Sequence, residues 1–252
     1  MRNLFLFLPG RCGGSGRLIK NNFTAEGGSF LPPIFINFSE GKMDYTVVDM
    51  EKWKRAELFS HYMDYMRIVL SLTVDIDVTR LKEYSVKTGI GFYPLMIWVV
   101  SKVINSHDEF KYSRNEKGEL IRWDTVSPSY TVFHKEDENF TKMLTEYSED
   151  LFEFYERFKE DGKKHENERA IVKDHPANFF DVSCLPWVKY RHFDMHVFDN
   201  GMFLAPVVTW GKYEEENGRL IMPLSMNIHH AVADGFHLSR FFNEVQEEIN
   251  SL

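Results

Sequence analysis

The 252-residue chain is 43% hydrophobic and 15% aromatic, which is enough apolar material for one large domain or two small ones. A formal net charge of −8 provides no basic surface for nucleic acid, and no apolar stretch approaches the length of a membrane span. Two cysteines, Cys12 and Cys184, cannot form a disulfide framework and indicate a reducing compartment, so we expect a cytoplasmic protein with neither a nucleic-acid nor a membrane partner.

Residues 1–42 differ in composition from the rest of the chain. They hold 7 of the 15 glycines and 3 of the 9 prolines, and they show no sustained periodicity. Their apolar run Leu4–Leu8 is too short for the core of a signal peptide. Gly- and Pro-rich segments of this kind rarely bury enough surface to fold. We predict that residues 1–42 are a flexible or non-native extension and that residues 43–252 form the folded domain.

The first half of this domain shows both strand and helix patterns. Asp49 and Asp77 are the expected caps of its first two helices, and Gly89 is the expected end of the second. Pro94 falls in the first turn of the third, where proline is tolerated. The periodicities predict, in chain order, strand 45–48, helix 51–66, strand 68–76, helix 77–87, helix 92–104 and strands 110–113, 120–123 and 129–134.

The second half begins with an amphipathic helix, whose acidic side we interpret as a solvated face. The periodicities predict helix 146–160, strands 179–183, 193–198, 202–209 and 220–228, and a terminal helix 236–249. Strands and helices mix without regular alternation, and no internal repeat is present. This pattern predicts an α/β fold, a two-layer sandwich with a mostly antiparallel or mixed sheet.

The most informative segment is His229–Gly235, between the last predicted strand and the last helix. A histidine at a strand exit is well placed as a general base, because the backbone is rigid there and the side chain can face a cleft. One alternative is a purely structural histidine pair. Another is a metal site, since His230, Asp234 and His237 would share one face of a continuous helix. Gly235 disfavours such a helix, and no second ligand cluster is evident.

From Met43 onward the sequence resembles the chloramphenicol acetyltransferase family. The resemblance rests on several separate stretches, namely WKR at 53–55, GFYPLMIW at 91–98, SCLPW at 183–187, LAPVVTWGKY at 204–213 and HHAVADGFH at 229–237. The histidine motif alone is shared with dihydrolipoyl acyltransferases, so the specificity lies in the combination. Family members begin a few residues before the first of these landmarks, and we expect Met43 to be the authentic start.

The resemblance implies a chloramphenicol acetyltransferase-like fold and a homotrimer with active sites at the subunit interfaces. It implies acetyl transfer from acetyl-CoA to the primary hydroxyl of chloramphenicol, which inactivates the antibiotic. His230 would be the general base that takes the hydroxyl proton, and neither an acetyl-enzyme nor a metal is implied. An imidazole of ordinary basicity suits this role because it is largely neutral near pH 7.

Further site residues follow from the same resemblance. Ser183 would donate a hydrogen bond to the oxyanion of the tetrahedral intermediate, and Thr209 would hold an ordered water near the reacting centre. Asp234 would form an internal ion pair with Arg55, in contrast to the His–Asp pairing of serine hydrolases. The remaining residues are aromatic or aliphatic and could equally belong to the core: Tyr62, Ile68, Tyr130 and Phe133 for the antibiotic pocket, and Trp187 and Tyr213 for the coenzyme side.

Two departures and two competing functions remain open. The motif carries Ala233 where many members have cysteine, and Cys184 follows the oxyanion serine, where a nucleophilic role is disfavoured. A dihydrolipoyl acyltransferase core would share the fold and the base, although the SxxPW and WxR contexts match the antibiotic enzymes. An inactive homologue that serves as a binding or scaffolding subunit is the third reading, and the intact set of site residues argues against it.

Overall fold

A computed structural model describes residues 45–172, 176–197 and 202–252. Its centre is a seven-stranded sheet in the order β2-β10-β8-β7-β5-β6, with β9 paired to β10. The strand β7 pairs in parallel with β5 and β8, and the other pairs are antiparallel. The strands of this sheet are β2 (Val69–Asp77), β5 (Ser127–His134), β6 (Asn139–Leu144), β7 (Phe179–Leu185), β8 (Val207–Gly211), β9 (Glu214–Glu216) and β10 (Arg219–His229).

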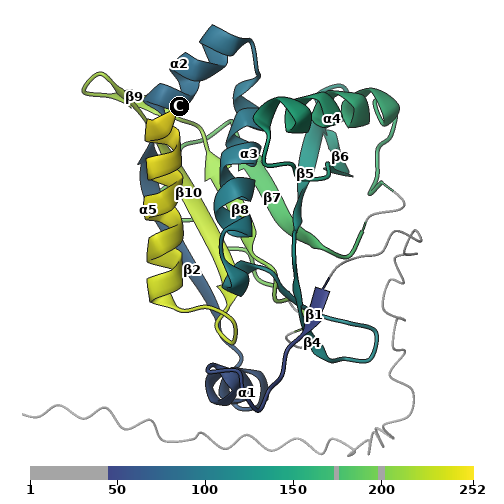
Figure 1. The fold of residues 1–252 in the computed structure, drawn as a ribbon. Coiled ribbons are helices and arrows are strands. Elements are labelled where there is room, and N and C mark those ends of the chain that lie inside the picture. The colour runs from purple at the N-terminus through teal and green to yellow at the C-terminus, as the bar shows by residue number, and fades with distance from the viewer. Residues whose placement is uncertain (1–44, 173–175, 198–201) are drawn as a thin grey trace, which may run out of the picture. The chain divides into compact units, whose positions relative to one another are not determined.

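Four helices cover one face of the large sheet (Figure 1). They are α2 (Thr79–Thr88), α3 (Phe92–Asn105), α4 (Leu151–Lys164) and α5 (Gly235–Ser251). The remaining elements are α1 (Ala56–Asp64), the short 3-10 helix η1 (Asp108–Phe110) and a small antiparallel sheet of β1 (Tyr45–Val47), β4 (Leu120–Trp123) and β3 (Tyr112–Arg114). The predicted two-layer α/β sandwich with a mixed sheet is confirmed.

The two faces of the large sheet differ because apolar and polar residues alternate along its strands. The helix face is apolar and buried, as at Val208 and Trp210, and the Trp210 ring packs 5.6 Å from that of Tyr93 in α3. The opposite face carries a row of small polar side chains that the strand register aligns: Thr73, Ser225, Thr209 and Ser183. The second face therefore carries hydroxyl groups, whereas the first face packs against the helices and forms the hydrophobic core.

The chain segment after β7 covers part of this polar row. The Tyr190 hydroxyl donates to the Thr209 carbonyl at 2.8 Å, and the Ser225 hydroxyl lies 3.1 Å from the Tyr190 hydroxyl. Thr209 and Ser225 are therefore fully buried although both are polar.

Several predicted helix signals are confirmed. Gly89 ends α2 in the left-handed region with φ of +75°, and Pro94 lies in the first turn of α3. The predicted cap Asp77 is displaced by one residue: it accepts a hydrogen bond from the Thr79 backbone N–H at 3.0 Å, but the residue at the cap position of α2 is Val78. The predicted start of the first helix is wrong: Asp49 accepts from the Glu51 N–H at 3.1 Å within a turn, and α1 begins only at Ala56.

Some strand predictions are also wrong. Residues 193–197 form no strand, because their polar contacts go to side chains of the sheet, such as the Phe193 N–H to Thr73 Oγ1 at 3.4 Å. The strand predicted over 202–209 begins at Val207, and β6 and β9 were not predicted. Residue 198 and the extension 1–42 lie outside the described residues.

Candidate active site

His230 directly follows β10, at the start of the turn that leads into α5. Its backbone N–H donates to the Ile68 carbonyl at 2.8 Å, which continues the hydrogen bonding between β10 and β2. Its ring Nδ1 lies 2.8 Å from the Ala233 carbonyl oxygen. Since a carbonyl can only accept, Nδ1 carries the hydrogen, and in the neutral ring Nε2 holds the lone pair. No described residue bonds Nε2, so this nitrogen is available as a base.

Tyr62 of α1 fixes the plane of the His230 ring. The two rings stack with centroids 3.9 Å apart and an interplanar angle of 23°. Stacking on one side and the Nδ1 hydrogen bond at the edge together restrict rotation of the imidazole. The geometry pre-orients His230 before any substrate binds.

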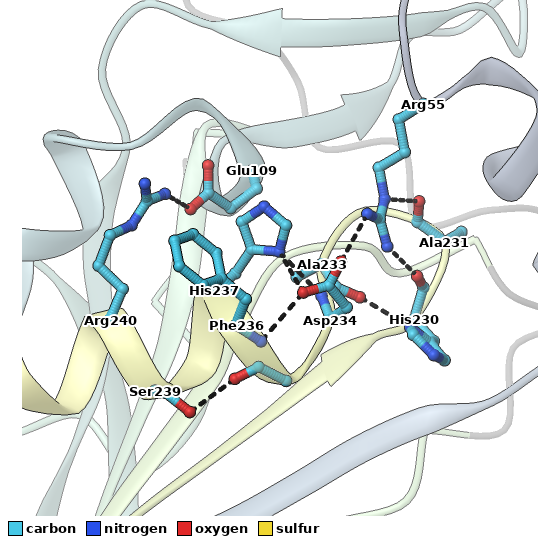
Figure 2. Close-up of polar contacts among 11 residues, drawn as sticks. Arg55, Glu109, His230, Ala231, Ala233, Asp234, Phe236, His237, Ser239 and Arg240 are labelled. Atoms are coloured by element: carbon cyan, nitrogen blue, oxygen red, sulfur yellow. Dashed lines mark hydrogen bonds and ion pairs between the residues drawn. The ribbon is translucent and has the colours of Figure 1, made fainter.

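Arg55 holds the histidine turn through three hydrogen bonds (Figure 2). Its Nη2 donates to the His230 carbonyl and its Nε to the Ala231 carbonyl, both at 2.8 Å. Its Nη1 lies 3.0 Å from Asp234 Oδ2. The Arg55 side chain is only 14% exposed, so the guanidinium is a largely buried link between α1 and the turn.

Asp234 caps α5 and pairs with Arg55, and it does not contact the His230 ring. Its Oδ1 accepts from the Phe236 N–H at 3.0 Å, and its backbone N–H donates to His237 Nδ1 in a capping box (Figure 2). Burial acts to raise the pKa of Asp234, but the hydrogen bond from Arg55, the Phe236 N–H and the positive charge of Arg55 outweigh it and lower that pKa. The carboxylate is thus held ionised as a structural group.

A second group of predicted residues lines a cavity of about 1230 Å³. Ser183 belongs to its wall, and Phe133 and Trp187 form a T-shaped pair there with centroids 4.8 Å apart. Tyr213 lies against Phe92 of α3 at 5.3 Å. Most of the remaining wall is aromatic or aliphatic, so the cavity suits a largely apolar ligand.

The cavity lies where the large sheet divides. The pairing of β5 with β7 is short: it runs from the pair Ser127–Phe179 to the pair Tyr130–Val182. Beyond that point β5 pairs with β6 and β7 with β8, so the two strands separate. The lining includes Tyr130 from the helix face and Ser183 from the opposite face, so residues of both faces bound the cavity where the strands separate.

Tyr130 contributes its ring to the wall but is anchored in the core. It is fully buried, stacks on Phe158 of α4 at 5.0 Å, and its hydroxyl lies 2.8 Å from Thr145 Oγ1. Burial raises the pKa of this phenol, although the Thr145 hydrogen bond opposes the shift. The Tyr130 hydroxyl therefore stays protonated and supports the wall.

Thr209 lies beside Ser183 in the register of β8 and β7. It is fully buried, and within the described part of the chain its Oγ1 has no hydrogen-bond partner. A buried hydroxyl without a protein partner is a typical site for an internal water.

The structure does not bring the two groups of residues together within one chain. Tyr62, Ile68, Arg55, His230 and Asp234 gather around the turn that follows β10. Ser225, which is in register with Thr209 beside Ser183, lies five residues before His230. At about 3.3 Å per residue this separation is roughly 16 Å along the strand. The base and the serine hydroxyl cannot act on one bond in a single chain.

Sequence reasoning missed several residues of the cavity. The most notable are Lys142 of β6 and Asp181 of β7, which form an ion pair in its wall. Residues 139–144 carry no clear strand signal, because apolar and polar residues do not alternate there, so β6 could not be recognised from the sequence. Nothing in the sequence could pair Lys142 with Asp181, because the contact depends on the order of β6, β5 and β7.

Two further properties of the described residues bear on function. They contain no group of three His, Cys, Asp or Glu side chains arranged to hold a metal ion. Across residues 45–172, 176–197 and 202–252, no helix has the length and apolar character needed to cross a membrane.

Comparison with known proteins identifies relatives over most of the chain. The family model for chloramphenicol acetyltransferase matches residues 43–246. A chloramphenicol acetyltransferase of Clostridium perfringens is 38% identical over 207 residues, covering 81% of this chain and 94% of the relative. Chloramphenicol acetyltransferase 3 of Escherichia coli is 37% identical over 211 residues, covering 83% and 99%.

Solved structures show the same fold. A chloramphenicol acetyltransferase structure superposes with a TM-score of 0.72 at 21% identity, over 82% of this chain and all of that one. A dihydrolipoamide acetyltransferase of Azotobacter vinelandii superposes with a TM-score of 0.57 at 16% identity, over 87% and 96%.

Proposed function

Because the chain belongs to the chloramphenicol acetyltransferase family and is an acyltransferase, we propose that it transfers the acetyl group of acetyl-CoA to the primary hydroxyl of chloramphenicol. Relatives that carry this activity in their names match it over nearly their whole length, which favours the antibiotic as acceptor. The observation that carries the chemistry is the Nδ1 hydrogen bond of His230 to Ala233, which leaves Nε2 as the basic nitrogen.

The proposed reaction is a direct transfer in which His230 acts as the general base. Its Nε2 takes the proton of the primary hydroxyl as that oxygen attacks the thioester carbonyl carbon. The resulting oxyanion accepts a hydrogen bond from Ser183, and Thr209 holds a water nearby. Collapse of the tetrahedral intermediate breaks the carbon–sulfur bond, and the coenzyme thiolate receives the proton from His230.

The character of Cys184 supports a mechanism without an acyl-enzyme. Burial raises the pKa of this thiol to about 12, although a hydrogen bond with Trp210 opposes the shift. The thiolate is the nucleophilic form, and at neutral pH Cys184 is almost entirely thiol. The cysteine next to Ser183 is therefore a poor acceptor for the acetyl group.

We propose that the complete site is formed between copies of the chain in a cytoplasmic homotrimer. Along the strand, His230 lies roughly 16 Å from the level at which Ser183, Thr209 and Ser225 are aligned. This separation supports the arrangement, since a neighbouring copy can supply the histidine that the cavity of one chain lacks. In this assembly the turn that carries His230, with Tyr62 and Ile68, faces the cavity of the next copy. Chloramphenicol contacts Phe133, and Trp187 and Tyr213 face the coenzyme.

An assay of the full chain with acetyl-CoA and two separate acceptors tests the proposed function. With chloramphenicol we expect release of free coenzyme thiol and a singly acetylated antibiotic, identified by mass spectrometry. With dihydrolipoamide we expect no release above the background without acceptor. Transfer to dihydrolipoamide alone would identify a dihydrolipoyl acyltransferase, and transfer to neither acceptor would favour a binding subunit. Sedimentation analysis of the same sample measures the oligomeric state, and a monomer at active concentrations would exclude the interfacial site.

A further inference from the structure

One ion pair interrupts the apolar wall of the cavity. Lys142 of β6 contacts the carboxylate of Asp181 of β7, and its Nζ also lies 3.4 Å from the Ser129 carbonyl. The two side chains are only 16% and 28% exposed. Among the described lining residues, Lys212 is the only other charged one. Charged groups are costly to place against an aromatic wall, so the pair calls for a physical explanation.

The position of the pair relates it to Ser183. Asp181 and Ser183 are two residues apart on the same face of β7, and both line the cavity. Two residues of a strand span about 7 Å. Lys142 reaches this carboxylate from β6 across the intervening β5. The pair therefore lies next to the point where negative charge develops during the proposed transfer.

Asp181 alone would oppose the reaction. If the two negative charges are about as far apart as these two residues, about 7 Å, then at an effective dielectric constant of about 20 their repulsion corresponds to a rate loss of up to roughly 50-fold. The Lys142 ammonium, in contact with the carboxylate, cancels most of this field.

We propose, on the basis of the function proposed above, that Lys142 is a positioning residue for acetyl transfer. It neutralises Asp181, so that the surroundings of Ser183 tolerate an oxyanion. Lys142 touches neither reactant in this proposal and acts only through Asp181. Two simpler roles make different predictions: a mechanical clamp between β6 and β7, and a direct contact to a phosphate of the coenzyme.

The test compares Lys142→Met, Asp181→Asn and the double variant in the full-length protein. Lys142→Met leaves a lone carboxylate, and we expect kcat to fall roughly 10- to 50-fold while KM for acetyl-CoA changes less than about threefold. The double variant removes both charges, and we expect it to recover at least about fivefold of that loss. Lys102→Met is the matched control, because Lys102 pairs with Glu248 at 2.7 Å outside the cavity lining, and its kcat should stay unchanged.

A melting curve of each variant ensures that all rates are measured on folded protein. A double variant no faster than Lys142→Met would indicate a clamp and overturn the proposal. A raised KM for acetyl-CoA with unchanged kcat would indicate a phosphate contact and also overturn it. If Lys142→Met does not fold, Asp181→Asn decides: its remaining ammonium should give a kcat above that of the double variant, and an equal or lower kcat overturns the proposal.

The wild type separates this inference from the proposed function. A wild-type chain that does not acetylate chloramphenicol would overturn the proposed function, and this inference with it. An active wild type with an unrescued Lys142→Met variant would overturn the role of Lys142 alone.

Discussion

At the scale of single residues, two adjacent histidines have opposite surroundings. His229 ends β10, is 5% exposed, and accepts at Nδ1 a hydrogen bond from the Ala231 N–H at 3.1 Å. His230 is less buried, and its Nε2 points to no described partner. The first ring belongs to the packing of the turn, and the second leaves its Nε2 open, as the proposed role of general base requires.

This contrast predicts different effects of the two alanine variants. His230→Ala should lower kcat for chloramphenicol by about 10²- to 10⁴-fold with little change in melting temperature, because it removes the base. His229→Ala should lower the melting temperature through lost packing and hydrogen bonding while the folded protein keeps most of its kcat. Steady-state kinetics and thermal denaturation on the same preparations measure both effects. An active His230→Ala variant would remove His230 from the mechanism.

The sequence allowed a choice of motif residues but not of the residues around them. His230, Ser183 and Arg55 could be selected because the resemblance names their positions. Lys142 and Asp181 could not be selected in this way. They are 39 residues apart in the sequence, and the strand that carries Lys142 was not predicted. Nor could the sequence locate Tyr62 over the imidazole, since stacking depends on how α1 meets the end of β10.

At the scale of secondary-structure elements, Arg55 connects the start of α1 to the start of α5. The Asp234 carboxylate completes this connection and also caps α5. The sequence predicted α3 and α5 well, because both have long apolar periodicity and because Pro94 marks the first turn of α3. The strand prediction for residues 193–197 was wrong. Alternation of apolar and polar residues cannot distinguish a strand that pairs with another strand from a segment whose backbone forms hydrogen bonds with side chains.

A double-mutant cycle should detect the connection between these helices. Arg55→Ala and Asp234→Ala should each lower stability toward urea, and the double variant should lose less than the sum by about 0.5–3 kcal/mol at pH 7. The pKa of Asp234 is lowered in the folded state, so its contribution is present above the ordinary value of 3.8 and is lost as pH falls below it. The coupling should therefore shrink in this acid range. Additive single effects at pH 7 would mean that the two residues are not energetic partners.

At the scale of the whole molecule, the family match begins at residue 43, where the composition also changes. We predict that a chain starting at Met43 acetylates chloramphenicol as fast as the full chain and forms the same oligomer. Its melting temperature should change by no more than about a degree or two, because Gly- and Pro-rich segments rarely offset the entropy of ordering them. Calorimetry and sedimentation of both chains measure these properties. A large loss of stability would show that residues 1–42 pack on the fold.

The separation of β5 from β7 has a consequence for the order of events during turnover. Residues of both faces of the sheet bound the cavity, and under the proposed function the two substrates would approach it from different faces, so that neither has to leave before the other binds. Such a site favours a mechanism in which both substrates are bound at once, in a ternary complex, over a ping-pong mechanism in which the first product leaves before the second substrate binds. Dead-end analogues of one substrate would then compete with that substrate alone. A bulky side chain introduced between the separating strands would obstruct the meeting of the two ligands while leaving each able to bind by itself.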